Sequence, residues 1–203
     1  MLPDEEALAQ VTLDRPISAL QGDHFVFRDH SAQRTMGGGI VIDPWPPQRG
    51  RKRPQRLLAL ASLADKDPRQ ALLQFVSRDP GWVDLKRFEL ARNLTPAEAA
   101  ELWRASDLVC VGAGDAFFGF GRQNWQSLSG RVQAVLALHH QAAPSASGLE
   151  PGRLRAALDL QLPVKVFSSA IGAMARGGTI QCDGPWLKLA GHAARLTPAD
   201  QRL

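Results

Sequence analysis

Alternating hydrophobic and polar positions predict β-structure in the first part of the chain. Turn residues separate three strand-like stretches, which are residues 11–20, 24–29 and 34–43. Phe25 and Phe27 are two positions apart in the middle stretch and should therefore share one face of a strand. We predict an antiparallel meander. Because three strands cannot close a barrel alone and little sequence precedes them, we expect the closing part of a larger barrel.

A proline-rich connector ends this β pattern. Pro44, Pro46 and Pro47 surround Trp45, and proline stops a strand because it lacks a backbone N–H. We therefore expect an extended linker over residues 44–53.

Hydrophobic positions at helical spacing follow the linker. Asp67 stands where an N-cap is expected, and Thr95 with Glu98 has the pattern of a capping box. The predicted helices begin at Pro54, at Pro68, near Val83 and at Thr95, and the predicted strands after them are 108–112 and 116–120. Three or more helices followed by a two-stranded hairpin is the order of a winged helix.

The same order recurs in the remainder of the chain. Helices are predicted at about 122–141, 152–158 and 163–176, and a hairpin at 179–182 and 186–190. The fold class is therefore a multidomain α+β protein. Its predicted parts are a partial β-barrel at 1–43, a basic linker at 44–53, winged helices at 54–121 and 122–192, and the start of a further, incomplete helix at 193–203.

The hydrophobic content of the chain is high enough to form a buried core in each of these domains. Hydrophobic residues make up 44% of the 203 residues. No apolar stretch is long enough to cross a membrane and the N-terminal residues are acidic, so we expect a cytoplasmic, monomeric protein without a membrane segment. Cys110 and Cys182 are far apart in sequence and are interpreted as small core residues, with neither a disulfide nor a metal site expected.

Positive charge is concentrated in and beside the linker. Five basic residues fall within eight positions and exceed the net charge of +4 of the whole chain; they are Arg49, Arg51, Lys52, Arg53 and Arg56. Cations near phosphates release condensed counterions, so this cluster is a candidate RNA-binding segment. A solvated charge run without a partner is the alternative.

Three consecutive glycines, Gly37, Gly38 and Gly39, lie in the last predicted strand. Each costs roughly 0.5–1 kcal/mol relative to alanine, so the structure must require them. A sharp bend of the barrel and the close approach of another backbone are both possible reasons. They are not a phosphate loop, because no GxxxxGK[ST] motif occurs in the chain.

The segment from Gly22 to Asp43 resembles the closing strands of the third domain of elongation factor Tu and its relatives. An arginine-bearing strand with Arg28, a short loop at 29–33, and Arg34-Thr35 before the glycine run carry this resemblance. Within that superfamily, the longer loop, the Asp43-Pro44 exit and the basic linker are similar to the bacterial selenocysteine-specific elongation factors. In those proteins the barrel continues into a string of winged helices.

The resemblance implies that the chain is an internal fragment that contributes to delivering selenocysteyl-tRNA at UGA codons in selenocysteine incorporation. It also implies contacts with the ribosome and the selenocysteine-insertion mRNA hairpin through the full-length protein. GTP and Mg²⁺ would be bound by a GTPase domain that this chain lacks, so no cofactor is expected here. The loop that matches 29–33 faces the T stem of tRNA in elongation factor Tu. The resemblance implies RNA contacts at this loop for His30, Ser31, Gln33 and Arg34. Arg28 is a further RNA candidate because of its positive charge.

Three interpretations compete with this one. Arg28 could simply pair with Asp29 or Asp43 on the barrel surface. The winged helices could belong to a DNA-binding transcriptional regulator, although the third helix of the first carries Glu98 and Glu101 and would repel phosphates. A structural adaptor without RNA affinity is the third possibility. We found no catalytic constellation and expect no enzymatic activity in this chain.

Overall fold

The computed structural model describes residues 6–78, 81–159 and 162–193. The chain forms two compact units: the first joins Met1–Phe75 with Arg87–Leu102, and the second joins Val76–Lys86 with Trp103–Leu203. Among the described helices, none is both long and apolar enough to cross a membrane. Residues 194–203, which hold nearly all of the further helix predicted at 193–203, lie outside the described residues.

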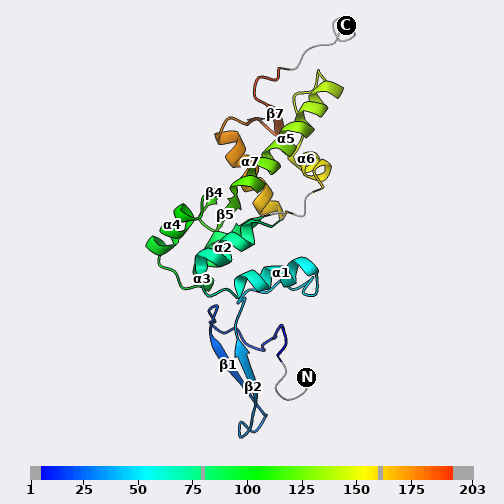
Figure 1. Ribbon diagram of the computed structural model, residues 1–203. Coiled ribbons are helices and arrows are strands. Elements are labelled where there is room, and N and C mark those ends of the chain that lie inside the picture. The colour runs from blue at the N-terminus through cyan, green and yellow to red at the C-terminus, as the bar shows by residue number, and fades with distance from the viewer. Residues whose placement is uncertain (1–5, 79–80, 160–161, 194–203) are drawn as a thin grey trace, which may run out of the picture. The chain divides into compact units, whose positions relative to one another are not determined.

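A β-hairpin dominates the first part of the first unit. Strand β1 (His24–Arg28) pairs antiparallel with strand β2 (Thr35–Ile40), and the hairpin extends away from the helices of its unit (Figure 1). Phe25 and Phe27 meet edge to face with ring centroids 5.0 Å apart, which confirms that they share a face. The register shifts between Phe27 and Arg28, so Met36 is an extra, bulged residue on β2.

The prediction of a strand at 11–20 was wrong. These residues form no strand, and Val11, Leu13 and Ile17 are exposed. A strand needs a neighbour that pairs with its backbone groups, and hydrophobic alternation does not supply one. Pro16, which has no N–H to donate, interrupts the same stretch.

The described helices of the first winged-helix sequence are α1 (Pro54–Leu63), α2 (Pro68–Val76), α3 (Leu85–Ala91) and α4 (Pro96–Ala105). Of these, α2 and α4 begin where their N-cap signatures predict. The Asp67 carboxylate accepts the N–H of Arg69 at 2.9 Å, which is an N-cap bond. At α4 the capping box is reciprocal: Glu98 accepts from the N–H of Thr95 at 2.8 Å, and the Thr95 hydroxyl accepts from the N–H of Glu98 at 3.3 Å.

A short strand replaces the first part of the helix that was predicted to begin at Val83. Strand β3 (Trp82–Asp84) pairs with β5 (Ala116–Gly121), which also pairs with β4 (Leu108–Ala113), giving the order β3-β5-β4. The prediction was wrong here because β5 supplies a partner from more than 30 residues away, and helical periodicity in a single segment cannot show that. Val83 is buried in this sheet.

The second winged-helix sequence follows the predicted order. It contains α5 (Arg122–Ala142), α6 (Pro151–Ala157), α7 (Val164–Arg176) and the hairpin of β6 (Ile180–Asp183) and β7 (Trp186–Leu189). Val132, Leu136, Leu154 and Val166 are almost fully buried at its centre. Apolar positions at helical spacing on α5 and α7 thus form the core of the second unit.

The β4–β5 hairpin shares this core. Val111, Phe118 and Phe120 belong to the same buried cluster as Phe167 and Ile171 of α7. The wing of the first winged-helix sequence therefore packs against the third helix of the second. The domain bounds proposed from the sequence remain predictions.

Both cysteines are exposed, which corrects their interpretation as core residues. Cys110 lies beside Val111, and successive residues of a strand point to opposite faces, so the buried position belongs to Val111. Cys182 lies near the tip of the β6–β7 hairpin, beyond the core.

Candidate nucleic-acid interface

The loop between β1 and β2 is held by the carboxylate of Asp29. Its Oδ1 atom accepts the backbone N–H groups of Gln33 at 2.9 Å and Arg34 at 3.2 Å, and its Oδ2 atom accepts the Ser31 hydroxyl at 3.0 Å. Ala32 adopts a left-handed backbone conformation with φ of 57°. These bonds give the loop a defined shape although it is at the surface.

This bonding also affects the protonation of Asp29. Donation from the Arg34 backbone N–H is the largest cause of a pKa below the usual value for this carboxyl group. Burial opposes that shift, while the Ser31 hydroxyl and the Gln33 N–H strengthen it. The loop therefore depends on an ionised Asp29.

The polar residues predicted to contact RNA surround this carboxylate and face solvent. His30, Ser31, Gln33 and Arg34 are exposed, as is Arg28 at the end of β1. Arg28 donates to the Ala32 carbonyl at 3.2 Å, across the base of the loop. Asp43, one of the partners considered for Arg28, binds Arg56 instead.

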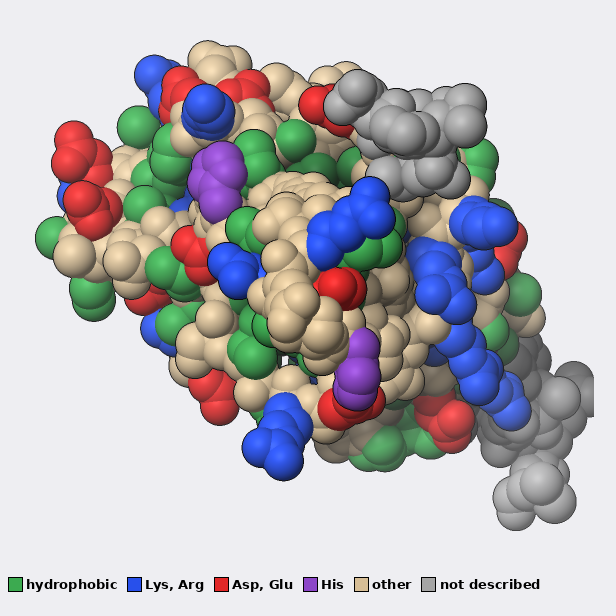
Figure 2. All heavy atoms as spheres, turned by 90° about the horizontal axis from the view of Figure 1, so that it is seen from below, with side chains coloured by type: hydrophobic (Ala, Val, Ile, Leu, Met, Phe, Trp, Pro, Cys, Tyr) green, Lys and Arg blue, Asp and Glu red, His purple; other side chains and the backbone are tan. Residues whose placement is uncertain are grey.

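Four cations of the basic cluster are exposed in the linker and at the start of α1: Arg49, Arg51, Lys52 and Arg53. The Arg53 N–H donates to the Gly50 carbonyl at 3.1 Å in a turn where Gly50 has φ of 78°. Figure 2 shows a molecular face on which Lys and Arg side chains form a run, with Asp and Glu side chains scattered elsewhere. The cluster thus remains available to an anionic partner.

Arg56 differs from the other four. Its Nη2 atom lies 2.7 Å from Oδ2 of Asp43, and both side chains are only 16% exposed. Four cations of the cluster therefore face solvent. The charge of the fifth, Arg56, is neutralised by Asp43 within the first unit.

The glycine run lies against β1. A Cβ atom on Gly38 would stand 2.5 Å from the Phe25 carbonyl oxygen, and one on Gly39 would stand 2.8 Å from the Phe25 ring. Gly37 has no neighbour within 4 Å of that position. Close approach of the paired strand accounts for two of the three glycines. No lysine followed by Ser or Thr comes after these glycines, so they do not form the phosphate loop of a nucleotide site.

The third helices carry few basic residues: Arg104 is exposed on α4, and Lys165 and Arg176 are exposed on α7. Glu98 of α4 is occupied by its capping box and Glu101 is exposed. On α7, Ser169 lies against the β4–β5 hairpin, because a Cβ atom on Gly112 would be 3.2 Å from its hydroxyl. One long face of α7 is thus covered by the wing of the preceding sequence.

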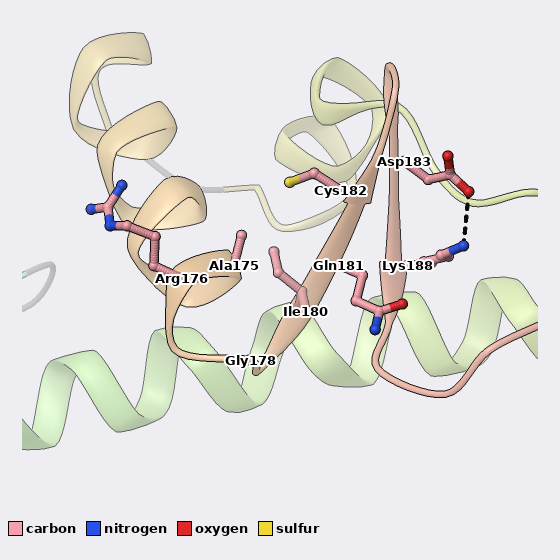
Figure 3. Close-up of a pocket in the computed structure, with 8 residues that line it drawn as sticks. All are labelled: Ala175, Arg176, Gly178, Ile180, Gln181, Cys182, Asp183 and Lys188. Carbon is pink, nitrogen blue, oxygen red and sulfur yellow. Dashed lines mark hydrogen bonds and ion pairs between the residues drawn. The ribbon is translucent and has the colours of Figure 1, made fainter.

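An open groove of about 560 Å³ lies between the C-terminal end of α7 and the β6–β7 hairpin. Arg176 points away from the hairpin, and the Lys188 ammonium group is 2.8 Å from the Asp183 carboxylate (Figure 3). Because its lysine is paired with an acid, this groove has little net positive charge for a phosphate.

Comparison with known proteins agrees with this arrangement. The model of the selenocysteine-specific elongation factor beta-barrel domain matches residues 1–48, and the model of the elongation factor SelB winged helix matches residues 133–189. The selenocysteine-specific elongation factor of Escherichia coli (strain K12) is 30% identical over 202 residues, covering 98% of this chain. This chain belongs to the selenocysteine-specific elongation factor family.

A second relative in this family, from Desulfomicrobium baculatum, is 25% identical over 202 residues. The chain spans about a third of the length of these curated relatives, 32% and 31% respectively. The fold class predicted from the sequence, a barrel segment followed by winged helices, is confirmed by the two family models.

Sequence reasoning missed two residues that organise this interface. The sequence indicates turns at Gln21-Gly22-Asp23 and at Asp29 to Gln33, and Asp29 was also considered as an ion-pair partner of Arg28. An Asp that opens a short loop is a known signal for side-chain bonds to the following backbone N–H groups, and that role of Asp29 was missed. For Gln21, the turn signal gives no indication of a contact with the helices. Its partners lie 42 and 70 positions further along the chain, and no local pattern indicates them.

Proposed function

We propose that this chain is part of an elongation factor that delivers selenocysteyl-tRNA to the ribosome at UGA codons. Within it, the β1–β2 hairpin and the linker contact the tRNA. The winged helices form an arm toward the part of the protein that binds the selenocysteine-insertion mRNA hairpin. GTP and Mg²⁺ are assigned to a domain outside this chain, and the protein acts in the cytoplasm.

One observation carries the tRNA assignment. The linker cations Arg49, Arg51, Lys52 and Arg53 are exposed, and they stand in the unit that also carries the exposed Arg34 loop. The alternative of a DNA-binding regulator has no comparable support. One third helix is acidic, and the other is packed against the β4–β5 wing.

Binding of the 203-residue chain to an unacylated tRNA transcript tests this proposal. If about four cations reach phosphates, the logarithm of the affinity should fall against the logarithm of salt with a slope of roughly −3 to −4. Replacing Arg51, Lys52 and Arg53 with glutamate should remove most of the binding. No preference for selenocysteyl-tRNA is expected, because the pocket for the aminoacyl end is assigned to other domains.

Glu101→Ala is the control, since this exposed α4 residue also changes charge but lies outside the proposed interface. An unchanged affinity after the triple reversal would reduce the linker to a solvated charge run and refute the assignment.

A further inference from the structure

Gln21 joins the base of the β1–β2 hairpin to the helices of the first unit. Its backbone N–H donates to the Ala91 carbonyl at the end of α3, at 2.7 Å. Its side-chain Nε2 donates to the Leu63 carbonyl at the end of α1, at 3.1 Å. One residue thus contacts the C-terminal ends of two helices.

These two carbonyls need partners from elsewhere, because the last carbonyls of a helix have no N–H within the helix to bind. The Leu63 carbonyl also accepts the Arg92 guanidinium at 3.0 Å, and the same Nη2 atom of Arg92 lies 2.8 Å from the Asp65 carbonyl. Gln21 and Arg92 together complete the end of α1.

A second contact ties the other side of the hairpin base to α1. Asp43 follows β2 and pairs with Arg56 of α1 at 2.7 Å, and its second oxygen accepts the N–H of Trp45 at 2.9 Å. The linker 44–53 therefore runs between two points that are held together, as a closed loop.

Hairpin pairing continues from the strands down to these contacts. The Gly22 N–H donates to the Val41 carbonyl, and the Val41 N–H donates to the Asp23 carbonyl, each at 2.8 Å. The bonded ladder thus links the joint at the base with the Asp29 loop at the tip, about 15–20 Å away for strands of this length.

We propose that Gln21 and the Asp43–Arg56 pair form a coupling joint, which makes the hairpin and helices α1 and α3 one rigid body. A hairpin attached only through a proline-rich linker would reorient independently of the helices. The joint instead holds the loop cations and the linker cations at a fixed spacing. This last role rests on the proposed function, in which both groups bind one tRNA.

Fixed spacing matters because two weak contacts on one body bind more tightly than two contacts that move separately. Gln21 and Asp43 are then positioning residues. They need not touch RNA to strengthen its binding.

The substitutions that test the joint can be chosen by hydrogen-bonding capacity. Gln21→Met keeps the length and neutrality of the side chain and removes its donor. Gln21→Lys keeps a donor, and the carboxyl end of α1 favours a positive charge, so it should rescue the joint. Asp43→Asn removes the charge that binds Arg56 and keeps an acceptor for the Trp45 N–H.

Residual dipolar couplings of backbone amides in the 203-residue chain measure the coupling without RNA. The amides of β1 and β2 and those of α1 and α3 should fit one alignment tensor in the wild type. The double variant Gln21→Met with Asp43→Asn should lose this shared tensor, and Gln21→Lys should keep it. Gln55→Met, at an exposed position near the start of α1, is the matched control.

Separate tensors in the wild type would overturn the proposal, whether or not any variant folds. A shared tensor retained by the folded double variant would overturn it as well. In tRNA binding, Gln21→Met should lose about tenfold in affinity with the salt slope unchanged, since this substitution leaves every charged residue and the Asp43–Arg56 pair in place. Failure of the wild type to bind tRNA would refute the proposed function and leave the coupling to be judged by the tensors.

Discussion

The imidazole rings of His140 and His192 stack in parallel, with centroids 3.5 Å apart and planes inclined by 11°. The Leu189 N–H donates to Nε2 of His140 at 3.2 Å, which requires that atom to be unprotonated. His192 Nε2 lies 3.2 Å from the Ala146 carbonyl. The stack therefore ties α5 to the residues after β7 only while His140 is neutral.

This geometry predicts that acid weakens the second unit. Burial lowers the pKa of His140 from its usual value of 6.5, and His192 and His139 lower it further. Below pH 6.5, His140 is protonated in the unfolded chain but stays neutral in the folded chain until the pH reaches its lower folded pKa. The contribution of His140 to the free energy of unfolding should therefore be fully present above pH 6.5 and should be lost as the pH falls through the folded pKa.

Thermal unfolding monitored by near-ultraviolet circular dichroism between pH 5 and pH 8 measures this effect. His140→Gln keeps an acceptor and does not titrate, so it should flatten the pH dependence in that window. His24→Gln, at an exposed position of β1, is the control and should leave it in place. Equal pH dependence in wild type and His140→Gln would contradict the prediction.

The glycine run should respond unevenly to alanine. Gly38→Ala places a methyl group against the Phe25 carbonyl and should destabilise the hairpin by about 1–3 kcal/mol. Gly37→Ala meets open space and should stabilise it by about 0.4–1 kcal/mol, because the unfolded chain loses freedom. Hydrogen exchange of the β1 and β2 amides gives both values. Equal effects at the two positions would show that close approach does not explain Gly38.

The β1–β2 loop should lose its order when Asp29 loses its charge. The folded pKa of Asp29 is depressed below 3.8, so the loop bonds are intact above that pH and are lost as the pH falls through the folded value. Asp29→Ala should produce the same loss at neutral pH, seen as fast exchange of the Gln33 and Arg34 amides. Protection of these amides in Asp29→Ala would refute the role of the carboxylate.

Arg56 and Arg51 should behave in different ways despite being five positions apart. Arg56→Met leaves the poorly exposed Asp43 unpaired and should cost about 1–3 kcal/mol of stability, and it should weaken tRNA binding only through the joint, with the salt slope unchanged. Arg51→Met should change stability by less than about 0.5 kcal/mol and should weaken tRNA binding. Urea unfolding and filter binding of the two variants measure both quantities. A changed salt slope of tRNA binding in Arg56→Met would contradict this division.

Most helices and hairpins of the chain were predictable because their signals are local. The Thr95–Glu98 capping box, Asp67 before Pro68 and the Gly184 turn each act within a few residues, and the structure confirms the elements that they begin or connect. The surface exposure of the candidate RNA-binding residues was also predictable, because loops and runs of charged residues can be recognised directly in the sequence. Their contact with RNA remains a prediction.

By itself, the sequence determined the order of elements, the winged-helix character and the family resemblance. Only the tertiary structure decided that 11–20 forms no strand, that β3 joins the sheet, and that Arg56 is neutralised while Arg51 is not. It also placed the β4–β5 wing in the core of the second unit and Gln21 at two helix ends. Each of these depends on a partner distant in the chain, and burial and hydrogen bonding are settled by that partner rather than by the neighbours in sequence.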